Sequence, residues 1–168
     1  MALPAAVFFI STLALSAQTD SPKYGHMNLG NLMAQMPQTK VAEDSLGVFM
    51  AQLSARDSVM TKAFEVAYLQ LQKEYNEGSL TPVMLQQRQA QLEKQRQEIQ
   101  DFEAKAQKDI EARRAQLLQP IYNKVEEAIK AVAQENGYLM IFDISTGAML
   151  FAAETIDVMP LVKKKLGI

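Results

Sequence analysis

Two long helix-forming stretches separated by a short turn signal constrain the fold of this chain most strongly. Residues 38–76 and 82 to about 136 are rich in Gln, Glu, Lys, Arg and Ala, which favour helices. Between them, Gly78 can take the left-handed conformation that ends a helix. Thr81 can cap the next helix, with Pro82 at its first position. The two stretches therefore predict an antiparallel helical hairpin whose arm contains about 40 residues of each helix, a length of roughly 60 Å.

Apolar residues recur along both stretches with the spacing of a coiled coil. From Leu53 on, the steps alternate between three and four residues if Asp57 is counted as a polar member. The seam of the first stretch is Leu53, Asp57, Met60, Phe64, Ala67 and Leu71, and that of the second is Leu85, Leu92, Ile99, Ala106, Ile110 and Leu117. Positions 89 and 96 of the second seam are Gln and Arg. A seam half filled with apolar residues predicts a marginal contact between the helices.

Pro120 interrupts the second stretch. It removes the hydrogen bond to the Gln116 carbonyl, so a kink is expected there. Antiparallel pairing places Gln38 beside Pro120, where the first helix begins. We therefore predict an arm of residues 38–118, a body of residues 18–37 and 119–168, and a hinge at Pro120.

The body has an α+β pattern. Residues 24–29 form a short strand candidate and residues 31–36 a helical turn. After Gly137, residues 138–144 and 148–153 read as two strands of a hairpin, joined by a three-residue loop that ends in Gly. Asp157 is the expected cap of a closing helix. The predicted fold is thus mostly α, with a long antiparallel coiled-coil hairpin on a small β-strand body.

Both faces of the predicted strands are apolar. Tyr138, Met140 and Phe142 alternate with Leu139 and Ile141. A body of about 65 residues is too small to bury both faces of a sheet alone. We therefore expect a partner subunit, with the oligomer held together by Met27, Leu139, Ile141, Met149 and Phe151.

The N-terminal segment suggests export. Residues 3–15 are apolar and uncharged, too short to span a membrane but typical of a secretion signal. Small residues follow, and cleavage after Ala17, or else after Ser16, is expected, which gives a signal peptide of residues 1–17. The absence of Lys and Arg before this run leaves an uncleaved anchor or a buried first helix as the alternative.

Catalytic and ligand-binding patterns are missing from the sequence. His26 is the only His and there is no Cys, which excludes Ser-His-Asp triads, multi-His metal sites and thiol chemistry. Gly25 and Gly30 lack the spacing of a phosphate-binding loop. The net charge of -2 shows no excess of basic residues that would favour binding of nucleic acid. We expect a non-enzymatic protein without a metal, cofactor or nucleic-acid partner.

Soft and aromatic side chains on the arm suit promiscuous apolar contact with many partners. The candidates for client binding are Phe49, Met50, Met60, Phe64, Tyr68 and Met84. The alternative is ordinary seam packing, which we favour for Met60 and Phe64 because they lie in register. For Met50, Tyr68 and Met84 both interpretations stay open.

The order of these pieces resembles the Skp (OmpH-like) family. The residues that carry the resemblance are 26–32, H-M-N-L-G-N-L, then Val132–Ala133, the passage from Gly137 to Asp143, and the closing helix after Asp157. The resemblance implies a periplasmic homotrimer whose three arms enclose a cavity and hold unfolded outer-membrane proteins without ATP. Typical members are strongly basic, whereas this chain is slightly acidic. This departure puts contact with lipopolysaccharide or an anionic membrane surface in doubt.

Two other classes of function remain as alternatives. An envelope scaffold or adaptor with one fixed partner would demand a continuous apolar stripe on the outside of the arm. The arm is Gln-rich and patchy, which favours weak, distributed contacts. A cytosolic prefoldin-like chaperone is disfavoured by the predicted signal peptide.

Overall fold

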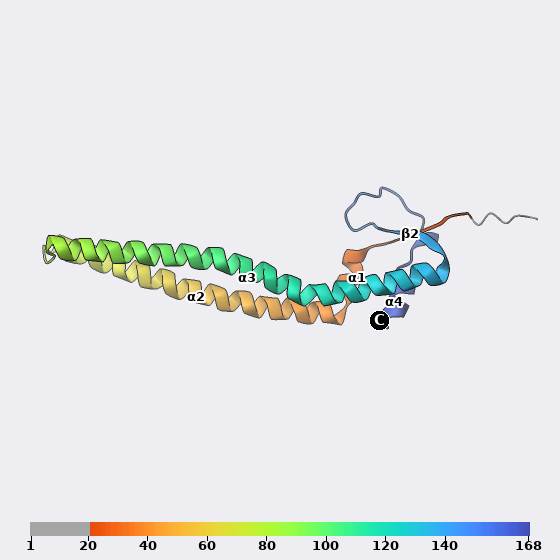
Figure 1. Cartoon of the computed structure of the whole chain (residues 1–168), viewed down its shortest axis with the longest axis horizontal. Coiled ribbons are helices and arrows are strands. Elements are labelled where there is room, and N and C mark those ends of the chain that lie inside the picture. The colour runs from red at the N-terminus through yellow and green to blue at the C-terminus, as the bar shows by residue number, and fades with distance from the viewer. Residues whose placement is uncertain (1–20) are drawn as a thin grey trace, which may run out of the picture.

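The computed structural model describes residues 21–168, so the predicted signal peptide and its cleavage site after Ala17 lie outside the described residues. Its elements in order are β1 (Lys23–Met27), α1 (Leu29–Gln35), α2 (Pro37–Asn76), α3 (Pro82–Asn136), β2 (Tyr138–Asp143), the short 3-10 helix η1 (Glu154–Ile156) and α4 (Met159–Leu166). Figure 1 shows a long helical hairpin that projects from a small α+β body. This architecture confirms the predicted fold class. We call residues 38–118 the arm and the remaining described residues the body.

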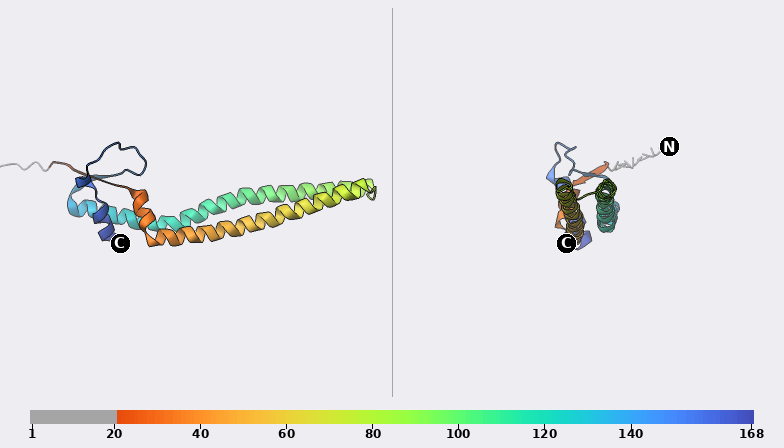
Figure 2. Two further views of the ribbon diagram at one scale, coloured as in Figure 1. Left: turned by 180° about the vertical axis from the view of Figure 1, so that it is seen from behind. Right: turned by 90° about the vertical axis from the view of Figure 1, so that its left-hand side faces the viewer.

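The arm is formed by α2 and α3, which run antiparallel side by side in each view of Figures 1 and 2. Gly78 ends the first helix with a φ of +66°. The Thr81 side chain caps the second helix by accepting a hydrogen bond of 3.3 Å from the Met84 N–H, and Pro82 opens the helix. The turn therefore uses the residues that the sequence predicts for it.

At the base of the arm, α3 continues through Pro120 without a break, and its course bends where arm and body meet (Figure 1). Gln38 lies beside Leu117 and Ile121 in one groove, which confirms the expected pairing of the two helices. Beyond the proline, Ile121 and Val125 are buried in the body. The role of Pro120 as a hinge stays a prediction.

The sheet is parallel and has β1 as its central segment. β1 pairs with β2, with Gly25 opposite Ile141 and His26 opposite Phe142. On its other side, His26 forms a parallel bridge with Asp157, and its carbonyl accepts a 2.9 Å hydrogen bond from the Val158 N–H. The chain after β2 therefore returns to the far edge of β1.

This topology shows that the predicted hairpin was wrong. Residues 148–153 form no strand, and Leu150 is 99% exposed. The Ile144 N–H still donates to the Met27 carbonyl at 2.9 Å, but Ser145 then bends the chain away by donating its N–H and hydroxyl to the Asp143 carboxylate. An apolar run does not by itself distinguish a strand from an uncovered loop.

The predicted faces of β2 also need correction. Tyr138 pairs with Lys23 but Met140 pairs with Tyr24, so Leu139 is an extra residue in the ladder. This irregularity places both Tyr138 and Ile141 against the core, whereas Met140 is exposed. A bulge changes the alternation of faces, and the regular period of two assumed from the sequence missed it.

The core of the body packs around the last part of α3. Its buried members are Met27, Leu32, Met33, Met36, Ala42, Ile121, Val125, Ala128, Val132, Val158 and Val162. They come from β1, α1, the starts of α2 and α4, and α3, so segments from both ends of the described chain form one cluster. The base of the arm is thereby fixed to the body.

Contacts at the end of α3 and at the start of α4 also hold the body together. Gly137 ends α3 with a φ of +70°, and the Lys23 ammonium donates a 3.0 Å hydrogen bond to the nearby Asn136 carbonyl. The closing helix starts one residue later than expected, with Val158 rather than Asp157 at the cap. Asp157 still accepts from the Met159 N–H at 2.8 Å. Its carboxylate therefore satisfies one of the N–H groups that helix starts leave unpaired.

Candidate functional site

The described residues offer no cluster of side chains that could hold a metal ion. Within residues 21–168, no group of three or more His, Asp or Glu side chains converges as a metal site. His26 is buried, and its Nε2 lies 3.0 Å from the Ala153 carbonyl oxygen, so this nitrogen carries the proton. None of the helices in this part of the chain is long and apolar enough to cross a membrane.

Asp143 organises the junction between β2 and α1. Its Oδ1 accepts hydrogen bonds from the Leu29 N–H at 3.0 Å and the Ser145 N–H at 2.9 Å. Burial raises the pKa of this carboxyl, but the hydrogen bonds from Ser145 and Leu29 outweigh burial and leave the pKa below its ordinary value. This carboxylate has a structural role at the start of α1.

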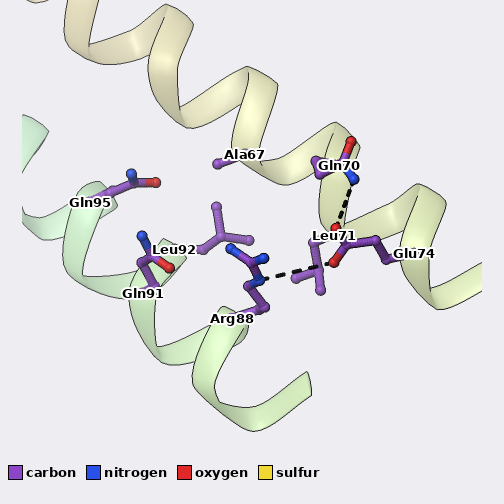
Figure 3. Close-up of a pocket in the computed structure, with 8 residues that line it drawn as sticks. All are labelled: Ala67, Gln70, Leu71, Glu74, Arg88, Gln91, Leu92 and Gln95. Carbon is purple, nitrogen blue, oxygen red and sulfur yellow. Dashed lines mark hydrogen bonds and ion pairs between the residues drawn. The ribbon is translucent and has the colours of Figure 1, made fainter. Parts of the chain in front are cut away.

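The small cavity near the tip of the arm belongs to the helix–helix seam. Figure 3 shows Leu71 and Leu92 pointing toward each other across it, with polar side chains around them. Gln70 donates a 2.7 Å hydrogen bond to Glu74, and Arg88 lies 4.0 Å from the same carboxylate. With a volume of about 60 Å³, the cavity has room for little more than a water or two.

Two of the predicted client-binding residues are part of the seam. Met60 and Phe64 are half-buried between the helices. Met60 lies beside Arg56, whose guanidinium stacks 4.9 Å from the centre of the Phe102 ring. Phe64 stacks on Tyr68, with ring centres 6.4 Å apart. The packing interpretation favoured for Met60 and Phe64 agrees with these positions.

The other candidates are more accessible and lie far apart. Phe49 is half-buried, whereas Met50, Tyr68 and Met84 are 42%, 52% and 43% exposed. From Phe49 to Tyr68 the rise of the helix amounts to roughly 29 Å. The structure thus stacks Phe64 on Tyr68 but makes no single pocket from this set. Any contact that uses these residues is distributed along the arm.

The largest exposed apolar residues of the arm belong mainly to α2, and all of them except Met50 and Tyr68 were missed by the sequence analysis. They are Val41, Val48, Met50, Val59, Val66, Tyr68, Leu69 and Tyr75. In α3 between residues 82 and 118, only Val83 and Met84 are comparably exposed, both at the tip. A second series of apolar residues with heptad spacing, offset from the seam, was the sequence signal that could have identified them.

Charged residues are more frequent on α3 than on α2. Within the arm, α2 carries four Lys or Arg and five Asp or Glu, whereas α3 carries seven Lys or Arg and six Asp or Glu. Several of the α3 charges pair along the helix, as Arg96 does with Glu93 and Lys105 with Asp109. α2 is therefore the less charged helix of the arm and α3 the more charged one, and the arm as a whole has almost no net charge.

The residues predicted to hold an oligomer together are divided between the core and the surface. Met27 is 2% exposed and lies in the core of its own chain, and Ile141 packs against that core. Leu139 and Phe151 are 64% and 85% exposed. Met149 lines a groove with Phe151, over one side of the sheet.

The body presents further uncovered apolar surface. Its exposed large residues around the sheet are Tyr24, Leu139, Met140, Phe142, Leu150, Phe151 and Ile156. In the described sheet β2 pairs only with β1, so its outer edge has no partner strand. Patches and edges of this kind are typical of interfaces between subunits.

A long helical hairpin on a small two-stranded body defines an elongated, mostly helical class of protein. The family model of outer membrane protein (OmpH-like) matches residues 23–166. The chain therefore belongs to the OmpH-like family, which confirms the resemblance seen in the sequence.

A solved structure supports the same fold. The crystal structure of a proposed outer membrane chaperone (OmpH-like) from Caulobacter crescentus CB15 matches with a TM-score of 0.72 at 18% sequence identity. The match covers 87% of this chain and 84% of that chain. No curated protein matches the chain. At 18% sequence identity, this similarity shows that the two chains share a fold.

Proposed function

We propose that this protein is an ATP-independent periplasmic holdase chaperone, which binds unfolded outer-membrane proteins between the arms of a homotrimer and prevents their aggregation. The observation that carries the proposal is the distribution of exposed apolar side chains along α2. Membership in the OmpH-like family and the chaperone name of the Caulobacter relative support it.

Distributed, shallow contacts suit an unfolded client. An unfolded chain has no fixed shape, so a surface that holds it gains from many interchangeable apolar contacts. Methionines and tyrosines at Met50, Tyr68 and Met84 add adaptable contacts at intervals along the arm. The helix backbone is already hydrogen-bonded within itself, so it does not compete for the client backbone.

The body supports assembly into the proposed trimer. The exposed Leu139, Phe142 and Phe151 and the open edge of β2 would be covered by neighbouring subunits. Assembly of this kind would place three arms around one space. Leu139 is a better probe of assembly than Ile141, because Ile141 contributes to the core of the subunit itself.

The proposed mechanism needs no nucleotide and no covalent chemistry. Binding would be driven by burial of apolar surface in an enclosed space, and release would follow when the client buries the same surface by folding. We therefore propose a non-enzymatic protein whose activity depends only on the binding equilibrium.

The test is suppression of aggregation. An unfolded β-barrel membrane protein is diluted from denaturant into buffer without nucleotide, with and without the mature protein, and light scattering is followed. We expect soluble client at about one trimer per client chain. Unchanged scattering, together with a single envelope protein recovered in stoichiometric amount by pull-down, would favour a scaffold with one fixed partner instead.

A further inference from the structure

The exposed valines of α2 belong to a regular second stripe. Starting from Val41 and ending at Leu69, steps of four and three residues alternate without exception. The nine positions of this outer stripe are Val41, Ser45, Val48, Gln52, Ala55, Val59, Lys62, Val66 and Leu69. Six of the nine are apolar, but Ser45, Gln52 and Lys62 interrupt the series, so it is not the continuous apolar stripe that one fixed partner would demand. This periodicity is that of a coiled-coil seam.

The outer stripe is not covered by its own chain. Its four valines and Leu69 are between 60% and 69% exposed. From Ala55 to Leu69 it lies about half a helical turn from the seam that includes Leu53, Met60 and Leu71. Nearer the base the offset is smaller, and Val41 and Ser45 line a groove with Leu117 and Ile121 of α3. Between Ala55 and Leu69, α2 therefore has apolar residues on two opposite faces, of which α3 covers one.

The area of the outer stripe limits what can occupy it. A fully exposed Val or Leu side chain offers about 60–120 Å² if its burial contributes 1.5–3 kcal/mol at 25 cal/mol/Å². Five such residues at the observed exposure then offer about 200–400 Å² in total. A stable interface needs about 800 Å² on each partner. The stripe is thus too small to hold a second folded copy by itself, but it suffices for one of several weak contacts.

The spacing of the outer stripe also argues against an extended partner in one fixed register. Successive stripe positions rise by about 5 Å along the helix, whereas side chains on one face of an extended chain recur about every 6.6–6.8 Å. The two periods do not match, so an extended segment gains apolar contact without one preferred alignment. Valine in a helix has little rotamer freedom left to lose, which lowers the entropy cost of such contact.

We infer that the outer stripe of α2 is the surface that contacts the client, and that its ligand is an extended, unfolded segment rich in apolar side chains. This inference rests on the proposed function and assigns it to one face of one helix. The polar face of α3 makes no comparable contribution. The seam residues Met60 and Phe64 act by holding the two helices together.

The first experiment compares two triple variants of the full mature protein. The stripe variant carries Val48→Gln, Val59→Gln and Val66→Gln. The matched control carries Ala90→Gln, Ala104→Gln and Ala112→Gln at exposed positions of α3. Gln forms helices better than Val, so the stripe variant should keep its helicity, which circular dichroism will check. Affinity is measured with a fluorescently labelled, unfolded β-barrel membrane protein.

We expect the stripe variant to bind at least tenfold more weakly than the wild type, and the control to bind within twofold of it. If stripe variant and control both bind as the wild type does, the outer stripe is not the contact surface, although the proposed function stands. If the wild type itself does not bind, the proposed function fails and the inference fails with it.

The second experiment distinguishes a client from a second copy on the stripe. The chain has no Cys, so Val59→Cys and Ala104→Cys each place one environment-sensitive dye at a known site. We expect the dye at position 59 to shift to the blue when unfolded client is added, and the dye at position 104 to stay unchanged. A blue shift at position 59 that follows chaperone concentration without client would mean that another copy covers the stripe, and would overturn the inference.

Discussion

Gly25 should be the glycine of this chain that least tolerates a methyl group. A Cβ added there would lie 2.7 Å from Cγ1 of Val158 and 3.2 Å from the Tyr138 ring. The first distance is about 0.7 Å short of ordinary contact, and Val158 is fully buried, so it has little room to move. Overpacking of this kind costs about 1–3 kcal/mol. We therefore expect Gly25→Ala to lower the stability of the body by that amount.

The assay is thermal and urea unfolding followed by circular dichroism, at one fixed protein concentration because assembly contributes to stability. For a chain of this length the expected loss corresponds to about 2–12 °C in Tm. Gly47→Ala is the matched control. Gly47 lies inside α2, and a Cβ there meets nothing within 4 Å, so the same methyl group should add about 0.5–1 kcal/mol of stability.

A double variant tests the cause. Val158→Ala removes the atom that the new methyl group meets first, so Gly25→Ala should cost less in that background than in the wild type. Equal costs in both backgrounds, or a Gly25→Ala protein as stable as the wild type, would refute the close packing of β1 against the start of α4.

Three further variants probe the arm, the body and the assembly. Asp143→Ala should cost about 1 kcal/mol, because it removes the acceptor of the Leu29 and Ser145 N–H groups. The carboxyl pKa is lowered in the folded protein, so this contribution should be present above pH 3.8 and lost as pH falls through the lowered value. Melts of both proteins from pH 7 to 3 that stay equally far apart would contradict it. Pro120→Ala should straighten α3 and change the small-angle scattering profile of the assembly, and an unchanged profile would show that the proline does not set the angle of the arm. Leu139→Asp should shift the mass measured by light scattering from three chains toward one, since a charge at a subunit interface is costly; a monodisperse monomer of the wild type would refute the trimer.

The arm could be predicted because each of its boundaries has a local chemical signal. Gly78, Thr81 and Pro82 allow few conformations other than a helix end followed by a helix start. The heptad pattern then fixed which face of each helix is buried. Local signals of this kind do not depend on contacts that are distant in sequence.

The body could be predicted only in part, because its contacts are distant. Nothing near residues 148–153 indicates that the far edge of β1 accepts the returning chain at Asp157 and Val158. The extra residue Leu139 depends on how β2 aligns with β1, which pairs segments more than a hundred residues apart. The Asp143 contact with Leu29 has the same long separation.

The candidate contact surface was missed for a different reason. Once the seam had been assigned, the remaining apolar residues of the first helix were read as scattered, and the arm as patchy. Val41, Val59 and Val66 are all exposed in the folded arm, and their spacing places them on one face of the helix. A search for a second heptad series in the same helix would have found them from the sequence.

The account rests on one central claim, that clients are held by apolar contact with an arm whose eleven basic and twelve acidic side chains nearly cancel. Long-range attraction is therefore weak, and salt does not screen apolar contact. The most direct measurement is the affinity for an unfolded β-barrel membrane protein, without nucleotide, at about 0.05 M and about 0.5 M salt, where the Debye length falls from roughly 14 Å to roughly 4 Å. We predict affinities that agree within about threefold. Loss of binding at the higher salt would show that charge holds the client and would contradict the account.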